Sequence, residues 1–519
     1  MDTALVEELY RLRGKDPEQA LSKLDLLGKS KGENIVKAIV LIDCGDALAR
    51  WNTVNEGVEL LQSLFSSDTP NPEDMYNLAN GLQVRARHSY GPVSPVFGRA
   101  PEDRFQARVL FGQVMKQQET TTETKSQMAT NIGILLLETH RWVEALDWFR
   151  HAQRELPRNG VAAFQEMRRL MKLAALFGQD RKTYHSYCDL DALLQRVRTL
   201  SGIVENNYNT ISEFAGSAAL EIVVPTVQDA KKIEVFPEPT LENPYYKFVQ
   251  ENDLTLRVCC SVDAYEDRQI DCLNIPSVQT ALGAGHEVPE IYAMMNVMKA
   301  DFAFARQLFF DVQECVEDTF LFETTTHSDT LDYALYGVRY SALTTAQRVA
   351  FDILDKIAVA MGCYFSIEKA DKTSFSRVWG TTGKGGVFKF RTKIETELGR
   401  GNQGLIALYN IHQDISKDEG RGAGFMKVFK QCRDTSTHKF SVLHDMGVRS
   451  GFSSSSAVEH QRVDEFERLT LDSIKLARAA LFYFVDAVVF SEKNNTRDDE
   501  AFVLESQVPD HRQIRGHDH

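Results

Sequence analysis

The chain has 519 residues, of which 43% are hydrophobic and 25% charged, a composition typical of a globular protein with roughly two to four domains. Its 73 acidic residues outnumber its 59 basic residues. The formal net charge of −14 argues against a protein that coats nucleic acid along its whole surface, although a local basic site stays open.

The chain start and the cysteines indicate a cytoplasmic protein. Met1-Asp2-Thr3 lacks the basic-then-apolar pattern of a signal peptide. The eight cysteines include no C-x-x-C pair, so we expect no structural zinc site of that kind, and their scatter fits reduced thiols. The longest apolar stretch, 479–490, contains Asp486 and is too short to span a bilayer, so we expect a core helix and no membrane association.

Residues 1–205 are predicted to form a domain of helical repeats. The clearest pattern covers residues 131–157, where small Gly133 lies at the close approach of the first helix to its neighbour and Phe149 fills the gap between the small residues of the second helix. The other positions of the pattern are Ala145, Ala152 and Pro157. These spacings resemble the TPR repeat, a pair of antiparallel helices of about 34 residues. An irregular bundle with one accidental TPR-like pair is the alternative.

Weaker copies of this pattern flank the clear one. Gly57 and Ala79 have the separation that the TPR period requires, and a loop signal follows at 90–92. Residues 161–178 and 181–199 are predicted to form another helix pair. Such pairs must stack to bury their apolar faces, and the resulting curved surface is expected to bind a protein partner.

Residues 206–244 are predicted to be a junction. The stretch 217–236 contains two β-branched runs separated by Pro225, which predicts two short strands or an extended linker.

Residues 245–495 are predicted to form a second helical domain, followed by a flexible tail at 496–519. Helical periodicity is expected over 288–317, 333–361, 403–415, 423–447 and 462–491. The Gly-rich stretch 380–386 lacks the spacing of a phosphate-binding loop and is expected to be flexible, so no cofactor is predicted. The predicted fold class is all-α, with a short β or extended junction.

The segment 432–440 carries the candidate chemistry. Arg433, Asp434 and His438 form an Arg-x4-His pattern with a polar residue directly after the arginine, between apolar periodic segments. This pattern, in a helical domain after a TPR-like region, resembles the HEPN superfamily. A second Arg-x4-His match at 512–517 lies in the polar tail.

The resemblance implies an endoribonuclease that needs no metal. His438 would act as general base or acid on the 2′-hydroxyl of RNA, and Arg433 would hold the phosphate. Asp434 would orient Arg433, or would be an ordinary helix N-cap. The implied products are a cyclic phosphate and a 5′-hydroxyl. The resemblance also implies a homodimer, in which both Arg/His sets line one cleft, and a role in toxin or anti-viral defence.

The charge around the motif supports RNA binding. Basic residues outnumber acidic ones between 421 and 450, and we assign RNA contacts to Lys430 and Lys439. A solvated helix face is the alternative explanation of this charge. His444 is expected at the surface, with a second acid/base role as its alternative, and His412 is expected to be structural.

Two non-enzymatic interpretations stay open. The second domain could be a HEPN-like binding or dimerisation module, with the repeats as a scaffold for protein partners. The chain could also be a nucleotidyltransferase partner or an antitoxin component.

Overall fold

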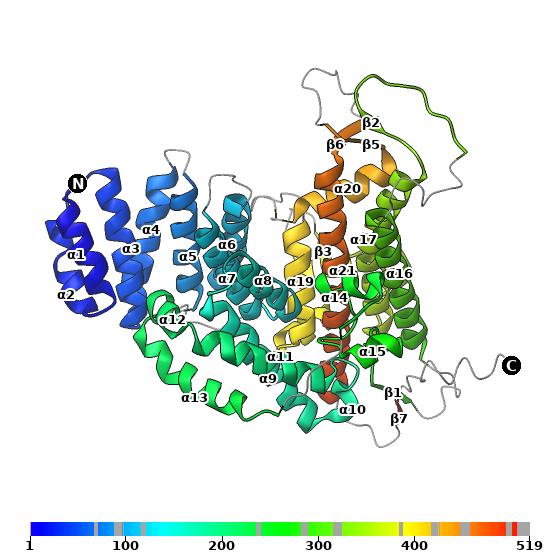
Figure 1. The fold of residues 1–519 in the computed structure, drawn as a ribbon, viewed down its shortest axis with the longest axis horizontal. Helices are drawn as coiled ribbons and strands as arrows, with labels where there is room; N and C mark the ends of the chain where they lie inside the picture. The colour runs from blue at the N-terminus through cyan, green and yellow to red at the C-terminus, as the bar shows by residue number, and fades with distance from the viewer. Residues whose placement is uncertain are drawn as a thin grey trace. The chain divides into compact units, whose positions relative to one another are not determined.

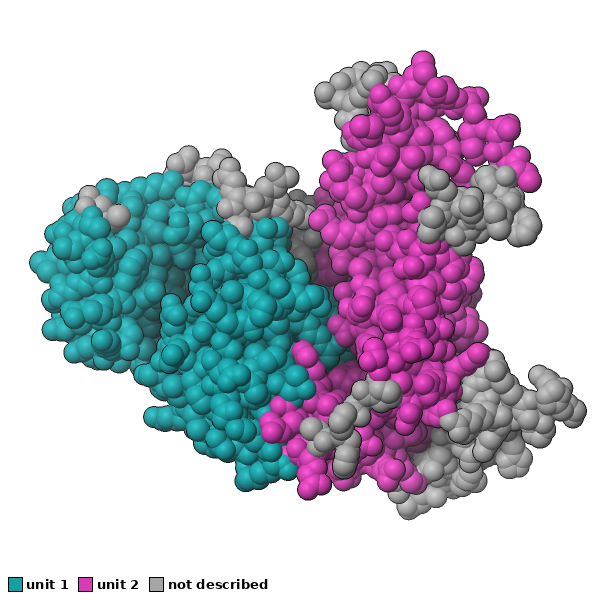
Figure 2. All heavy atoms as spheres, viewed as in Figure 1, with its two compact units in different colours: residues 1–169, 199–232, 421–425 teal, residues 170–198, 233–420, 426–519 magenta. Residues whose placement is uncertain are grey.

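The computed structural model describes residues 2–66, 71–87, 96, 98–115, 121–234, 240–281, 289–314, 324–383, 388–416, 424, 426–446, 457–494 and 501–505. The fold is all-α with a few short strands, as predicted. The chain divides into two compact units, which Figure 2 shows in different colours. Unit 1 comprises 1–169, 199–232 and 421–425; unit 2 comprises 170–198, 233–420 and 426–519.

Unit 1 is built mainly from helix pairs. Its elements are α1 (Thr3–Arg13), α2 (Pro17–Ser22), η1 (Leu24–Leu26), α3 (Lys31–Ala47), α4 (Trp51–Ser66), α5 (Pro72–Arg87), α6 (Arg99–Met115), α7 (Thr122–Glu138) and α8 (Trp142–Glu155). Figure 1 shows α3 to α8 as successive pairs, and in each pair the two consecutive helices pack on each other. This arrangement confirms the helical repeats. The predicted loop at 90–92 lies outside the described residues.

Gly133 lies at a close contact between α7 and α8, which explains why the TPR spacing requires a small residue here. A β-carbon at this position of α7 would lie 2.5 Å from the ring of Phe149 on α8. Phe149, Ala145 and Ala152 are fully buried in one apolar cluster that runs through α3 to α8. A side chain larger than hydrogen at residue 133 would therefore separate α7 from α8.

The rest of the first half is also helical, and this corrects the predicted junction. The elements are α9 (Gly160–Gln179), α10 (Arg181–Tyr184), α11 (Leu190–Glu205), α12 (Tyr208–Ala215), η2 (Ser217–Ala219) and α13 (Leu220–Lys231). The prediction of strands or an extended linker over 217–236 was wrong for α13, which contains Pro225. Val223, Val227 and Ala230 are buried at helical spacing, and this periodicity outweighs the β-propensity of the individual residues.

Unit 2 contains a bundle of long helices. Its remaining helices are α14 (Pro244–Glu251), α15 (Val262–Glu266), α16 (Glu290–Gln313), α17 (Val338–Tyr364), η3 (Ala370–Lys372), α18 (Thr392–Gly399), α19 (Gln403–Ile415), α20 (Lys427–His438) and α21 (Val463–Asn494). In Figure 1, α16, α17, α19 and α21 run alongside one another, and α17 and α19 each pack on α21. None of the described helices combines the length and the hydrophobicity needed to cross a membrane.

Short strands lie at both ends of this bundle (Figure 1). The sheet β2-β5-β6 lies beside α20, and β1 pairs with β7 at the opposite end. The bounds are β1 (Ser277–Ala281), β2 (Ala334–Leu335), β3 (Gly380–Thr382), β4 (Phe388–Phe390), β5 (Phe440–His444), β6 (Val458–Arg462) and β7 (Ala501–Glu505).

These strands correct three predictions of the sequence. The helix expected over 423–447 ends at His438, because Lys439 is extended and the chain continues as β5. Part of the expected flexible tail forms β7, while 496–500 and 506–519 lie outside the described residues. The Gly-rich stretch 380–386 begins with β3, which pairs antiparallel with β4, while 384–387 lie outside the described residues. Each strand forms because its backbone pairs with another segment of the chain. The periodicity of side chains along one segment does not reveal such a partner.

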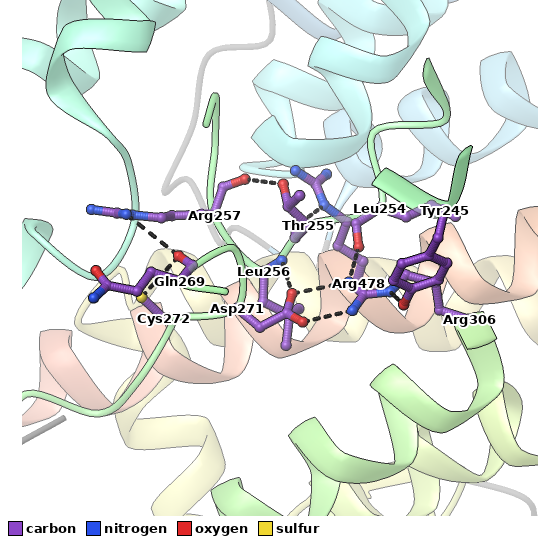
Figure 3. Close-up of polar contacts among 10 residues, drawn as sticks. All are labelled: Tyr245, Leu254, Thr255, Leu256, Arg257, Gln269, Asp271, Cys272, Arg306 and Arg478. Carbon is purple, nitrogen blue, oxygen red and sulfur yellow. Dashed lines mark hydrogen bonds and ion pairs between the residues drawn. The ribbon is translucent and has the colours of Figure 1, made fainter. Parts of the chain in front are cut away.

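A buried ion pair fixes the segment before β1 to the bundle. Arg306 on α16 donates to Asp271 through Nη1 at 3.0 Å and Nη2 at 2.7 Å, and to the carbonyl of Leu254 at 2.6 Å (Figure 3). Its Nε donates to the Tyr245 hydroxyl at 2.9 Å, and Asp271 also accepts the Leu256 amide. Burial alone would raise the pKa of Asp271, but the Arg306 charge and these hydrogen bonds lower it.

Candidate active site around α20

The helix α20 contains four of the five candidate site residues, and the fifth follows it directly. The four are Lys430, Arg433, Asp434 and His438, and the fifth is Lys439. Phe429, Cys432 and Thr435 are buried at helical spacing, which sets the face that packs inward. Cys432 and Thr435 face β6, where Thr435 donates a hydrogen bond to Glu459 at 2.5 Å. The helix is therefore fixed in rotation, and the directions of its polar residues follow.

Arg433 is half-buried against α17. Its Nη2 donates to Asp355 at 3.3 Å, while Nε lies 3.9 Å from a carboxylate oxygen of Asp352 and 3.6 Å from one of Asp434. The guanidinium also lies over the Phe351 ring, with its carbon 5.4 Å from the ring centroid. Three carboxylates thus surround the positive charge, and a phosphate ligand would have to displace or outweigh them.

Asp355 is itself held in place by the chain. Its Oδ1 accepts the amide of Phe375 at 2.8 Å, while Oδ2 accepts from Arg433. Burial raises the pKa of the neighbouring Asp352, and the charge of Arg433 opposes this effect. Neither acid was predicted from the sequence. Their signal was two carboxylates three residues apart, which lie on one face of a helix.

Asp434 lies in the interior of α20, so its alternative interpretation as an N-cap was wrong; Met426 occupies that position. The 3.6 Å distance to Arg433 Nε is consistent with the orienting contact that was expected.

His438 is exposed and is the last residue of α20. It lies five positions after Arg433, which on an α-helix corresponds to roughly 140° of rotation and about 7.5 Å of rise. One copy of α20 therefore does not place Arg433 and His438 on a common face. His438 instead shares a face with Asp434 and Lys430, at successive four-residue intervals.

The two lysines assigned to RNA differ in their surroundings. Lys430 donates to the Ser376 hydroxyl at 3.1 Å, which connects α20 to the segment before β3. Lys439 is exposed between α20 and β5. His438 and Lys439 therefore place one imidazole and one positive charge at the C-terminal end of α20, whereas Lys430 lies in the first turn of the helix.

His412 on α19 is structural, in agreement with the prediction. Its ring stacks on Trp379 with centroids 6.0 Å apart, and it also contacts Tyr409 and Phe375. Burial, aided by the charge of Lys430, lowers the pKa of His412 to about 4. This imidazole therefore stays neutral near neutral pH.

His444 was expected at the surface, and that prediction was wrong, since only 2% of the residue is exposed. Its Nδ1 lies 3.0 Å from the carbonyl oxygen of Asp332, and its Nε2 lies 2.8 Å from Nδ1 of His460. Among the described residues, Asp332, His444 and His460 form a group whose ligand atoms lie within 4.8 Å of one another, as metal binding requires. No sequence spacing signalled this group, because strand pairing assembles it.

Comparison with known proteins identifies the domain that contains these residues. Residues 282–491 match the profile of the LA2681-like HEPN family. The C-terminal region therefore holds a HEPN-superfamily domain, which includes α16 to α21 and both groups described above. No match was found among curated proteins or among solved structures.

Proposed function

We propose that this protein is a metal-independent RNA endonuclease of the HEPN type, with Arg433 and His438 as its catalytic residues. The observation that carries the proposal is the position of His438, which is exposed at the end of α20 inside the matched HEPN domain. An acid/base residue must reach its substrate, and this imidazole is accessible where a buried one would not be.

The chemistry assigns one role to each side chain. Neutral His438 removes the proton of a 2′-hydroxyl, and the resulting oxygen attacks the adjacent phosphorus. Arg433 binds the non-bridging oxygens and stabilises the charge that develops there. The 5′ oxygen leaves and takes up a proton, so the products are a cyclic phosphate and a 5′-hydroxyl. Lys430 and Lys439 add positive charge for the RNA backbone.

The active form is proposed to be a homodimer. Because one α20 directs Arg433 and His438 about 140° apart, we place His438 of one copy beside Arg433 of the second copy. Asp434, which lies beside Arg433, keeps the guanidinium oriented. The repeats of unit 1 offer a surface for a protein partner that targets or restrains the nuclease, and a role in toxin or anti-viral defence is part of this proposal.

The test is cleavage of end-labelled RNA by the full chain in EDTA, with Arg433→Ala and His438→Ala as variants. We expect the cleavage rate of each variant to fall by about 100-fold or more. This is the lower end of the effect that the loss of general acid–base catalysis has on a rate. Two exposed residues of the same unit, His185 and Arg400, provide matched control variants to alanine that should keep full activity. Equal cleavage by all four variants would refute the assignment.

A non-catalytic HEPN module is the second candidate, and the carboxylates around Arg433 favour it. If Asp352, Asp355 and Asp434 keep the guanidinium occupied, the domain binds partners without cutting RNA. Absence of cleavage by the wild-type chain at any ionic strength, with a protein captured by the repeats, would support this candidate.

A further inference from the structure

A cluster of two imidazoles and one carboxylate lies in the sheet β2-β5-β6. His444 ends β5, His460 is the central residue of β6, and Asp332 lies two residues before β2. The strand β5 pairs antiparallel with β2 and parallel with β6, so three segments distant in sequence meet here. On β6, Glu459 and Gln461 face α20, and His460 therefore lies on the opposite face with His444.

The hydrogen bonds of His444 prepare it to act as a metal ligand. Its Nδ1 donates to the carbonyl oxygen of Asp332 at 3.0 Å, which leaves the lone pair of Nε2 directed at His460. Histidine ligands of metals commonly donate their second ring N–H to a backbone carbonyl or carboxylate in this way. Without a metal, a proton on His460 Nδ1 is needed to bridge the 2.8 Å between the two nitrogens.

The carboxylate of Asp332 completes the group. Its Oδ1 accepts the Thr330 hydroxyl at 2.5 Å and the Ala334 amide at 3.2 Å, and these contacts orient the side chain. Only 6% of Asp332 and 2% of His444 are exposed, whereas His460 is partly exposed and leaves a route for entry. Buried polar groups at this density are costly unless they are paired or coordinate an ion.

We infer that Asp332, His444 and His460 bind a divalent transition-metal ion of the zinc class. Imidazole nitrogens with one carboxylate are typical of zinc ligands, whereas Mg²⁺ and Ca²⁺ prefer oxygen alone. In this site the metal takes the place of the bridging proton on His460 Nδ1, and the ring carries its proton on Nε2 instead after exchange with solvent. Three protein ligands leave a fourth position for water.

The two imidazoles need to move only slightly to bind the ion. Tetrahedral zinc with Zn–N bonds of about 2.0–2.1 Å separates two nitrogen ligands by about 3.3 Å, so the imidazoles must part by roughly 0.5 Å. The ion would connect β2, β5 and β6, a sheet in which β2 has two residues. Only Lys439 lies between the end of α20 and the start of β5, and the hydrogen bond from Thr435 to Glu459 holds this end of the helix without the ion.

The test measures metal binding by the full chain, independently of RNA cleavage. Protein stripped by a chelator is titrated with Zn²⁺ against a chromophoric competitor, and Co²⁺ absorption reports the coordination geometry. We expect one zinc per chain at this site, and a loss of affinity of about 100-fold or more in His460→Gln, beyond the effect usual for an outer-shell contact. Asp332→Asn should weaken binding less, and His185→Gln, at an exposed histidine, should not change it.

His444→Gln is a second variant. Because His444 is buried, the circular dichroism spectrum of this variant must first match that of wild type, to show that the variant folds. The partly exposed His460 keeps the test decisive if that variant does not fold. Equal zinc affinity in wild type and His460→Gln, or failure of the wild-type chain to bind zinc, overturns the inference. Since no step uses Arg433 or His438, either result leaves the nuclease proposal to its own test.

Discussion

The unfolding free energy of unit 2 should fall in mild acid because of one histidine. His412 is packed among aromatic rings, and its pKa is lowered to about 4 in the folded protein. In the unfolded chain an imidazole has a pKa of about 6.5. Between these values the unfolded state binds the proton and the folded state does not, so stability is complete above about pH 6.5 and is lost as pH falls toward 4.

The magnitude follows from the two pKa values. Between about pH 7 and pH 4.5, the equilibrium constant between the folded and unfolded states changes by roughly 1.8 logarithmic units. This corresponds to about 2.4 kcal/mol of unfolding free energy at 1.36 kcal/mol per unit. The residue keeps some exposure to solvent, which screens the effect, so we expect about 2 kcal/mol. His412→Phe should remove this contribution, because Phe preserves the stacking on Trp379 and, among the described residues, His412 Nδ1 has no hydrogen-bond partner to lose.

The assay is urea unfolding at both pH values, read by pulse hydrogen exchange at one fixed pH in peptides of α19. These peptides report unit 2 alone, which separates it from the unfolding of the repeats. Other groups also titrate, so the comparison of wild type with His412→Phe isolates the imidazole. An equal loss of stability in both proteins would refute the reasoning.

Three further outcomes follow from contacts in the two units. Asp355→Asn, made in the His438→Ala background, should tighten RNA binding by about 3- to 10-fold in fluorescence anisotropy. The reason is that the variant removes a partly exposed carboxylate that competes with RNA for Arg433, in an interaction of about 1 kcal/mol. Weaker binding would contradict this. Asp271→Asn should cost unit 2 about 3 kcal/mol in urea unfolding, because it leaves buried Arg306 without its charge partner, and a cost near zero would mean that the pair is dispensable. Gly133→Ala should destabilise the repeats by about 1–3 kcal/mol through contact with Phe149. Its matched control is Gly202→Ala, where the added methyl group meets no atom within 4 Å and should not destabilise.

The features that sequence predicted well are those set by local periodicity. Gly133 was predicted to lie where two helices approach closely because TPR helices repeat at a fixed spacing, and the structure shows this approach at the ring of Phe149. The helix 403–415 was predicted with the bounds of α19, since its apolar face continues without interruption from the Asn402 cap. The HEPN domain was recognised from the motif and its helical context, and the family match confirms it.

The features that sequence missed depend on contacts between distant segments. Asp355 reaches Arg433 from α17, 78 residues away in sequence. His444 and His460 meet across two parallel strands. The error at α13 was local instead, because the β-branched composition predicted strands although Val223 and Val227 are buried at helical spacing. Side-chain periodicity along one segment carries no information about which other segment will pack against it.

The most direct test of the central claim is to mix the two inactive variants. Arg433→Ala and His438→Ala are co-purified as one preparation, and RNA cleavage is measured in EDTA. If the site combines His438 of one copy with Arg433 of the other, half of the dimers are mixed and each has one intact site, so about a quarter of wild-type activity should return. If the mixture is as inactive as each variant alone while wild type cleaves RNA, the two residues do not act across a dimer, and the proposed site is wrong.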